Sequence, residues 1–205
     1  MARTKNQSAR REQLVAATLR VVAERGLGGV RIRDVAEAAG ISPRLVAYYY
    51  PDLDDLLDEV YRGAVERYYW QRLKAMEELN DPVDRLTTLI GTALPGGRDD
   101  LLSRVLYEMS VNGSRNPLHA TLLTLMFDRE VSLYATVLEA GCATGTFTLS
   151  EPITSVARNF VALEDAYGLH LLGNNSSLDA VTAEELLRSY ARIVTGAPIP
   201  SGAGP

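Results

Sequence analysis

The sequence has few of the residues on which disulfide-rich, metal-binding or catalytic proteins depend: one cysteine and two histidines among 205 residues. A single cysteine, Cys142, excludes an intramolecular disulfide, and the absence of a C-x-x-C or clustered Cys/His pattern predicts no metal site and no cofactor. We interpret Cys142 as a small buried filler, with a redox-sensing thiol as the alternative. This sparing use of cysteine favours a reducing compartment.

Long apolar segments are also missing. A membrane-spanning helix needs about 18 consecutive apolar residues, and charged residues interrupt every window of that length. Residues 1–11 are polar and basic and are not followed by the apolar stretch of a signal peptide. We therefore expect a cytoplasmic protein with no membrane partner.

Motifs of the common enzyme classes are absent as well. His119 and His170 have no metal-ligand spacing around them, and we expect each to be a surface or helix-end residue rather than a catalytic base. No G-x-S-x-G motif or phosphate-binding loop occurs, because the glycines at 26–29 follow a predicted helix rather than a strand and so indicate a turn. The sequence therefore favours a protein that is not an enzyme.

Charge is distributed unevenly along the chain. The net charge is −5, yet residues 1–50 hold nine Lys and Arg against four Asp and Glu, which gives this segment a charge of +5. A basic N-terminal part joined to an acidic remainder indicates that the N-terminal part meets a polyanion. A charged, solvated surface is the alternative explanation.

Apolar residues recur at helical spacing along almost the whole chain, and no segment shows the sustained alternation of a hairpin strand. The predicted fold class is therefore all-α. The Ser- and Gly-containing end, 199–205, is predicted to be disordered. Glycine, proline and capping residues delimit about nine helices. They cover roughly 8–25, 32–39, 43–49, 54–79, 82–95, 99–112, 117–142, 151–173 and 179–195.

One segment of the basic N-terminal part, IRDVAEAAGISPRLVAYYY, has the anatomy of a helix-turn-helix. Its small residues, such as Ala36 and Ala39, let two helices approach closely. Gly40 falls where the sharp turn needs a left-handed conformation. Ser42 can cap the second helix, and Pro43 suits its first position. The order of these signals predicts a motif that reads DNA.

At these residues the sequence resembles the N-terminal domain of the TetR family. The resemblance rests on RDVAEAAGISP at 33–43, on YYYP at 48–51 and on the helix at 14–26, which ends in AERG. It implies a three-helix DNA-binding domain at 1–50, a larger helical domain at 51–198 for ligand binding and dimerisation, and a homodimer.

The second helix of the motif is expected to enter the major groove with its N-terminal side chains at base edges. Arg44 is the predicted base reader, because its planar fork matches O6 and N7 of guanine, a pairing that contributes about 1–3 kcal/mol of discrimination. An ordinary solvated cation is the alternative for Arg44. The predicted DNA contacts are Arg33, Ser42, Pro43, Arg44, Leu45, Ala47, Tyr48 and Tyr49.

Some of these roles come from the resemblance alone. It implies that Tyr48 and Tyr49 donate to backbone phosphates, which fixes the register on DNA without reading its sequence. Tyr50 aligns with a core position and is therefore left out of the contact set. In a polar N-terminal stretch, Arg3, Lys5 and Arg10 are expected along the DNA backbone or in the minor groove.

Three residues depart from the family pattern. Ala47 stands where a tyrosine commonly touches DNA, so its methyl group is expected to meet a thymine methyl instead. Arg31 occupies a Ser/Thr capping position and cannot cap, and Leu53 replaces a lysine that often binds phosphate. The operator sequence of relatives therefore does not transfer to this chain.

The last two predicted helices carry long apolar stripes. The resemblance implies that they pair with their copies in a four-helix interface, and two-fold symmetry then spaces the reading helices by one DNA turn or a multiple of it. A role in the core alone is the alternative. With ALEDAYGL at 162–169 and AEELLRSY at 183–190, this part of the chain also resembles the C-terminal domain of BetI-like regulators. The predicted interface residues are Val156, Leu163, Leu171, Leu187 and Tyr190.

Aromatic residues recur in the middle helices, with carboxylates nearby in sequence. Because ring faces and carboxylates attract positive charge, the bundle interior suits a small apolar or cationic molecule. Simple core packing is the alternative for each ring. The predicted pocket residues are Trp70, Tyr107, Phe127, Tyr134, Phe160 and Glu164.

These patterns together predict a TetR-type transcriptional regulator. It is expected to bind double-stranded operator DNA as a homodimer and, as a repressor, to leave the operator when a small-molecule effector binds. Its expected location is the bacterial cytoplasm, on the nucleoid when bound to DNA. Activation in place of repression stays open, and the alternative class is a helical ligand-binding or scaffold protein without sequence-specific DNA binding.

Overall fold

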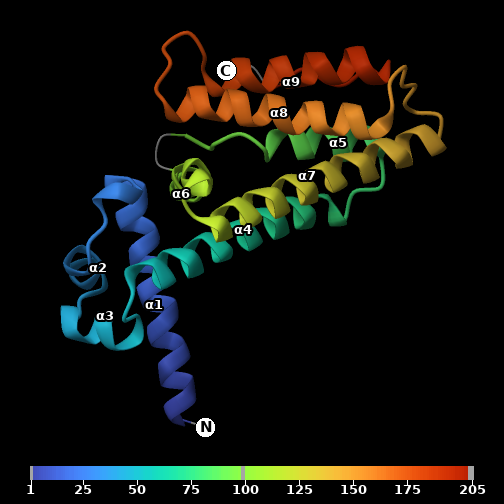
Figure 1. Cartoon of the computed structure of the whole chain (residues 1–205). Coiled ribbons are helices and arrows are strands. Elements are labelled where there is room, and N and C mark those ends of the chain that lie inside the picture. Colours follow the sequence, from blue (N-terminus) through green and yellow to red (C-terminus); the bar gives the residue numbers. More distant parts are fainter. Residues whose placement is uncertain (1, 98–99, 203–205) are drawn as a thin grey trace. The chain divides into compact units, whose positions relative to one another are not determined.

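The chain is described from a computed structural model that covers residues 2–97 and 100–202, without the side chains of residues 2–6 (Figure 1). Within these residues every regular element is helical: nine α-helices and two short 3-10 turns. The all-α prediction is therefore confirmed for the described part of the chain.

The N-terminal helices follow the predicted helix-turn-helix closely. Helix α1 (Ala2–Arg25) is followed by the 3-10 turn η1 (Leu27–Gly29), and then by α2 (Ile32–Ala39) and α3 (Pro43–Tyr49). Helices α2 and α3 have the predicted bounds. Helix α1 begins earlier than the predicted start near Ser8, because no glycine or proline interrupts the polar residues before it.

The remaining helices also lie close to their predicted positions. The segment predicted as one helix over 99–112 is shorter, because α6 gives way after Ser110 to the 3-10 turn η2. The elements are α4 (Leu53–Glu77), α5 (Pro82–Gly91), α6 (Leu101–Ser110), η2 (Val111–Ser114), α7 (Pro117–Ala143), α8 (Ile153–Leu172) and α9 (Ala180–Thr195).

Aspartates cap several of these helices. The carboxylate of Asp81 accepts hydrogen bonds from the first amides of α5, from Val83 at 2.8 Å and Asp84 at 3.1 Å. Asp179 accepts from the Thr182 amide of α9 at 2.7 Å. Each such cap stabilises its helix by about 1 kcal/mol, because it satisfies an amide that has no partner within the helix.

The chain divides into two compact units. Unit 1 comprises Met1–Arg67 and Leu101–Thr124, and unit 2 comprises Tyr68–Asp100 and Leu125–Pro205. Helices α4 and α7 therefore contribute to both units. The predicted boundary after residue 50 marks the end of the helix-turn-helix, but the compact unit around it is larger, because α6 packs against α1.

Each unit has its own apolar core. In unit 1 the buried residues come from all three N-terminal helices and include Leu14, Val22, Val35 and Val46. In unit 2 the core joins α5, α7, α8 and α9, and Figure 1 shows α8 and α9 running side by side. Its buried members include Leu86, Leu89, Ile90, Tyr134, Val137, Leu138, Phe147, Val156, Phe160, Leu187 and Ala191.

The predicted disordered tail is packed in the part that the structure describes. Ile199 is buried in the core of unit 2, the Pro200 carbonyl accepts a hydrogen bond from Arg188, and the Gly202 amide donates to Glu185. Residues 199–202 are ordered because Ile199 is buried and because Arg188 and Glu185 of α9 form hydrogen bonds with this part of the tail. The rest of the predicted tail, 203–205, lies outside the described residues.

The structure bears on two further expectations from the sequence, which concern a membrane-spanning helix and the burial of Cys142. Among the described helices, none is both long and apolar enough to span a bilayer. Cys142 is partly exposed at the end of α7, where it packs against the core of unit 2, so it is less buried than predicted.

Two helical glycines give opposite stability predictions. A methyl group added at Gly141 in α7 would overlap the ring of Phe147, whereas one added at Gly63 in α4 would meet nothing within 4 Å. Ala is a better helix former than Gly, so Gly63→Ala is expected to raise the free energy of unfolding by up to about 1 kcal/mol. Overpacking makes Gly141→Ala destabilising by about 1–3 kcal/mol. Urea unfolding of both variants compares them, and stabilisation by Gly141→Ala would contradict this packing.

Candidate DNA-binding surface and buried polar network

The turn between α2 and α3 is built by local interactions. Gly40 adopts a left-handed conformation, with φ 65° and ψ 36°, which a residue with a Cβ reaches only with strain. The Ile41 amide beyond it donates to the Ala36 carbonyl at 3.0 Å, closing the end of α2. Ser42 then caps α3, its Oγ accepting from the Leu45 amide at 3.3 Å, and Pro43 occupies the first position. The predicted local roles are confirmed: Gly40 forms the turn, Ser42 caps α3 and Pro43 is its first residue.

Helix α3 presents one face to solvent and buries the other. Val46 is 1% exposed and anchors the helix, with Leu45 and Tyr49 half-buried beside it. Arg44 and Ala47 are exposed, and Tyr48 is 67% exposed. A short helix with its N-terminal side chains in water is what insertion into a major groove requires.

The two cations assigned to DNA are available in unit 1. Arg33 has an 82% exposed side chain, 3.8 Å from the Asp34 carboxylate. Arg44 makes no hydrogen bond or ion pair among the described residues, so its guanidinium fork is open. Arg25, by contrast, forms a salt bridge of 2.7 Å with the buried Asp34, which ties α1 to α2. Arg25 is half exposed but held by this salt bridge, so Arg33 and Arg44 are the less constrained of the three cations.

Tyr50 belongs to the core, as predicted. It is 3% exposed, and its hydroxyl donates to Glu59 at 2.7 Å. Burial, with the Glu59 carboxylate next, raises the pKa of Tyr50 well above its ordinary value. Arg11 lies over the ring and also pairs with Glu59, so this cation is committed to the fold.

The remaining sequence expectations for the N-terminal part have mixed outcomes. Arg31 does not cap α2, as predicted, and instead donates to the carbonyls of Gly28 and Val30. Arg10, expected along DNA from a polar tail, lies in helix α1 and donates to Gln13. The side chains of Arg3 and Lys5 lie outside the described residues.

Unit 1 also contains a cavity of about 560 Å³, lined by residues of η1, α4, η2 and α7. His119, in the first turn of α7, is 1% exposed there and lies 3.0 Å from Asp58 and 3.2 Å from Asn112. Asn116 also donates to Asp58, at 3.2 Å. His119 is thus a helix-end residue, as predicted, but a buried one whose partners hold α7 against α4.

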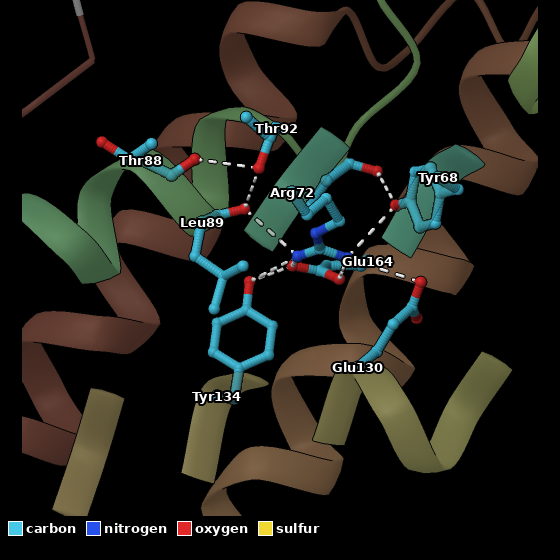
Figure 2. A network of polar contacts seen from close by, with 9 residues as sticks. Tyr68, Arg72, Thr88, Leu89, Thr92, Glu130, Tyr134 and Glu164 are labelled. Atoms are coloured by element: carbon cyan, nitrogen blue, oxygen red, sulfur yellow. Dashed lines mark hydrogen bonds and ion pairs between the residues drawn. The ribbon is translucent and has the colours of Figure 1, made fainter. Parts of the chain in front are cut away.

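A second polar cluster is buried inside unit 2 (Figure 2). Arg72 of α4 is 1% exposed, and its two terminal nitrogens donate to the two Glu164 oxygens, each at 3.0 Å. They also donate to the Leu89 carbonyl at 3.2 Å, the Tyr68 hydroxyl at 3.2 Å and the Tyr134 hydroxyl at 3.4 Å. The Tyr134 hydroxyl in turn donates to Glu164.

A second carboxylate, that of Glu130, faces the same guanidinium (Figure 2). Glu130 is 4% exposed, and its Oε1 lies 3.6 Å from a terminal nitrogen of Arg72, beyond hydrogen-bond distance. This oxygen is buried without a hydrogen-bond partner, and so is Nε of Arg72. Two carboxylates therefore compete for one guanidinium, and Glu164 holds it.

The pKa values in this cluster follow from burial and charge. Burial raises the pKa of Glu130 to about 8 against the lowering effect of Arg72, with Glu164 and Asp165 adding to the rise. Burial likewise raises the pKa of Glu164, which Arg72 partly offsets. Burial beside Glu164 raises the pKa of Asp165 to about 6. The interior of unit 2 is therefore short of positive charge.

The structure brings together only some of the predicted pocket residues. Tyr134 and Phe160 stack with ring centroids 4.6 Å apart, Glu164 lies in the network beside them, and Phe127 packs against the same core. Trp70 is 57% exposed and points away from the core of unit 2. Tyr107 belongs to unit 1, because α6 packs with α1 rather than within unit 2.

Sequence reasoning missed Arg72 and Glu130. Both lie at helical spacing within apolar stripes, Arg72 between the buried Val65 and Met76 on α4 and Glu130 before the buried Leu133 on α7. A charged residue in the buried stripe of a helix is a sequence signal for a paired interior charge.

Two of the predicted dimer residues lie in the core instead. Val156 and Leu187 are 1% and 0% exposed within unit 2, because they face the other helices of the unit. Leu163, Leu171 and Tyr190 are half-buried. The exposed apolar residues of α8 and α9 are Leu169, Val181, Leu186 and Ile193.

Comparison with known proteins gives a family match for the N-terminal part. Residues 14–60 match the sequence model described as bacterial regulatory proteins, tetR family. The HTH-type transcriptional regulator BetI of Burkholderia lata is 36% identical over 83 residues, which cover 40% of this chain and 42% of that protein. The chain thus matches less than half the length of this relative.

Longer matches are more distant. The HTH-type transcriptional repressor KstR2 of Rhodococcus jostii is 26% identical over 144 residues, 70% of this chain and 71% of that protein. A transcriptional regulator of Saccharomonospora viridis, solved in complex with choline, superposes with a TM-score of 0.84 at 24% identity, over 90% of this chain and 96% of that one. These relatives are transcriptional regulators, a class distinct from enzymes.

The match over 14–60 includes α2, the Gly40 turn and α3 with their observed geometry, and the structural neighbour extends the shared fold over nearly all the remaining helices. Residues 14–60 therefore match the tetR family of bacterial regulatory proteins, and the chain as a whole shares the fold of the S. viridis regulator.

Proposed function

We propose that this protein is a transcriptional repressor that binds operator DNA as a homodimer and leaves it when a small-molecule effector binds. The observation that carries the proposal is the exposed face of α3, where the capped N-terminus presents the open guanidinium of Arg44. DNA binding is assigned to residues 1–50, and ligand binding and dimerisation to 51–198.

The contacts on DNA divide by chemistry. Arg44 reads a guanine through its two parallel donors, while Ala47 offers a methyl group to a thymine. Tyr48, Tyr49 and Arg33 contact phosphates and fix the register of α3 in the groove. Ser42, Pro43 and Leu45 lie at the start of the same helix and approach the DNA backbone with it.

Dimerisation is assigned to the exposed apolar face of α8 and α9. Leu186, Tyr190 and Ile193 follow one another at helical spacing on α9, with Leu169 exposed on α8. The same patch on two copies makes a self-complementary interface of the kind that two-fold symmetry requires. Leu163 and Leu171 are half-buried on α8 and lie at the margin of this patch.

An effector is assigned to unit 2, with Tyr134, Phe160, Phe127 and Glu164 as the residues that the structure groups there. The choline complex of the S. viridis protein supports a ligand in a protein of this fold. Helix α4 contributes both to this unit and to the unit of α3. The effector is therefore proposed to release the protein from DNA by changing the position of α4. The name of KstR2 supports repression. A role on bacterial DNA assigns the protein to the cytoplasm, on the nucleoid when bound.

Arg44 is expected to control which DNA sequence is bound. Arg44→Ala should weaken binding to a fragment selected from randomised DNA by about 5- to 150-fold, the equivalent of 1–3 kcal/mol, and change binding to random DNA far less. Arg44→Lys keeps the charge but loses the fork, so it should also lose selectivity. Tyr48→Phe should weaken both complexes alike. Fluorescence anisotropy measures all four proteins, and equal losses on both DNAs from Arg44→Ala would refute the base-reading role.

Binding to the selected fragment is also expected to weaken steeply with salt. Each phosphate neutralised releases condensed counterions, so the logarithm of affinity should fall linearly with the logarithm of salt concentration, by roughly 0.9 per phosphate contact. The same anisotropy titration at several potassium chloride concentrations gives the slope. A flat dependence would argue against the phosphate contacts, and no detectable binding at any salt concentration would favour a helical ligand-binding or scaffold protein.

The dimer interface predicts a difference between two exposed apolar residues. Ile193 on α9 is 79% exposed, and Val111 on η2 of unit 1 is 76% exposed. Ile193→Asp should raise the dimer dissociation constant at least tenfold, because it places a charge in the apolar patch, whereas Val111→Asp should leave it unchanged. Sedimentation velocity over a concentration series distinguishes the two. A wild-type monomer would contradict dimerisation, and equal effects of both changes would place the interface elsewhere.

A further inference from the structure

The cavity of unit 1 has no role in the proposed function. Its volume of about 560 Å³ lies within the range of roughly 300–1,000 Å³ that is usual for small-molecule sites. The lining residues come from the segments around η1 and η2, from the first two turns of α4, from the end of α6 and from the first turn of α7. All of them belong to unit 1, whereas the effector is assigned to unit 2.

One wall of this cavity is formed by polar contacts between α4 and the start of α7. The buried His119 lies 3.0 Å from the Asp58 carboxylate, which also accepts a hydrogen bond from Asn116. The other ring nitrogen of His119 lies 3.2 Å from the amide nitrogen of Asn112. Because these side chains bind one another, a ligand does not have to order this wall when it enters.

A second part of the lining is held in place around η1. The Glu108 carboxylate accepts a hydrogen bond from the Leu27 amide at 3.1 Å. One terminal nitrogen of Arg31 donates to the carbonyls of Gly28 and Val30, at 3.1 and 2.8 Å. Glu108 and Arg31 are thus charged lining residues that serve the fold.

Two other charged lining residues, Asp54 on α4 and Arg115 after η2, are not committed in this way. Both are exposed, and neither side chain makes a hydrogen bond or ion pair with another residue that the structure describes. They do not pair with each other, although both line the same cavity. The cavity therefore offers a ligand one free carboxylate and one free guanidinium.

Apolar side chains line the cavity as well. Leu57 is 7% exposed, and Leu27 and Leu53 are half-buried. Val111 also lines it and is 76% exposed, which is unusual for a residue of its size and polarity. A ligand with an apolar part removes this surface from water when it binds.

We propose that this cavity binds a free α-amino acid with a large apolar side chain. The carboxylate of the ligand pairs with Arg115, whose planar fork matches a carboxylate through two parallel hydrogen bonds. Its ammonium group pairs with Asp54, and its side chain packs against Leu57 and Val111. The site goes beyond the proposed function, because it lies in the unit that carries the helix-turn-helix and takes a ligand other than the effector of unit 2.

The balance of charge in the lining favours such a zwitterion over a singly charged molecule. The carboxylates of Asp54, Asp58 and Glu108 stand against the guanidinium groups of Arg31 and Arg115. With both signs present in similar number, the cavity has no strong field that would concentrate a simple anion or a simple cation. A molecule with one group of each sign satisfies both free side chains.

L-Phenylalanine and two analogues with a single charge test the proposal. Hydrocinnamate lacks the ammonium group and phenethylamine lacks the carboxylate, while both keep the ring. Isothermal titration of the whole chain at neutral pH should show that phenylalanine binds at least about tenfold more tightly than either analogue, because each analogue loses a charge-assisted hydrogen bond. Glycine, which lacks the apolar side chain, should also bind at least about tenfold more weakly. L-Leucine and L-tryptophan extend the set to other apolar side chains.

Four variants assign the two charges. Arg115→Gln should lower the affinity for phenylalanine about tenfold and remove its preference over phenethylamine. Asp54→Asn should lower that affinity by a similar factor and remove the preference over hydrocinnamate. The matched controls are Arg62→Gln and Asp55→Asn, which change exposed residues of α4 that do not line the cavity and should bind as wild type does. Melting curves followed by circular dichroism show that all four variants are folded.

The proposal is wrong if none of the three apolar amino acids binds the wild-type protein. It is also wrong if hydrocinnamate or phenethylamine binds as tightly as phenylalanine, since one charge would then suffice. Equal losses in the control variants would place binding elsewhere on the molecule and so overturn it too. Selective DNA binding without amino-acid binding would remove this proposal alone, and amino-acid binding without selective DNA binding would remove only the proposed function.

Discussion

Unit 2 depends on how the buried guanidinium of Arg72 is satisfied. Its partners come from four helices: Tyr68 from α4, the Leu89 carbonyl from α5, Tyr134 and Glu130 from α7, and Glu164 from α8. Removing one partner of a buried ion pair costs about 3–5 kcal/mol, since the other charge stays behind without compensation. The four helices can therefore move relative to one another only if these partners are exchanged.

Unit 1 is held together differently. Its helix-turn-helix uses short-range bonds, such as those of Gly40 and Ser42, and a few ties to other helices. The Arg25–Asp34 salt bridge joins α1 to α2, and the Glu108 carboxylate of α6 accepts from the Leu27 amide at 3.1 Å. The side chains assigned to DNA make few of these contacts. Apart from Ser42 and Pro43, the side chains proposed to contact DNA are not those that hold the fold, and the exposed face of α3 is open to solvent.

Much of unit 1 is readable from sequence because its signals are local. Gly40, Ser42 and Pro43 determine the turn and the start of α3 within four residues, so both bounds of α2 and α3 were predictable. The network in unit 2 is not local. Arg72 and Glu164 are 92 positions apart, and helical periodicity marks each as facing inward without indicating that they meet. The order of the tail at Ile199 likewise depends on a core formed by distant helices.

The dimer residues show a second limit of sequence patterns. Helices α8 and α9 have apolar residues on two faces, one in the core of unit 2 and one in solvent. A periodic stripe does not tell which face turns inward, so the sequence pattern alone does not distinguish the core residues Val156 and Leu187 from interface residues. Leu186 and Ile193 on α9 became recognisable only once the packing was known.

The central claim is that a two-fold dimer reads a specific DNA sequence through two copies of α3. Footprinting of the purified protein on fragments selected from randomised DNA tests it most directly. A two-fold dimer should protect two half-sites of inverted sequence, centred one helical turn of DNA or a multiple of it apart. Failure to enrich any sequence, or protection of a single site without symmetry, would contradict it.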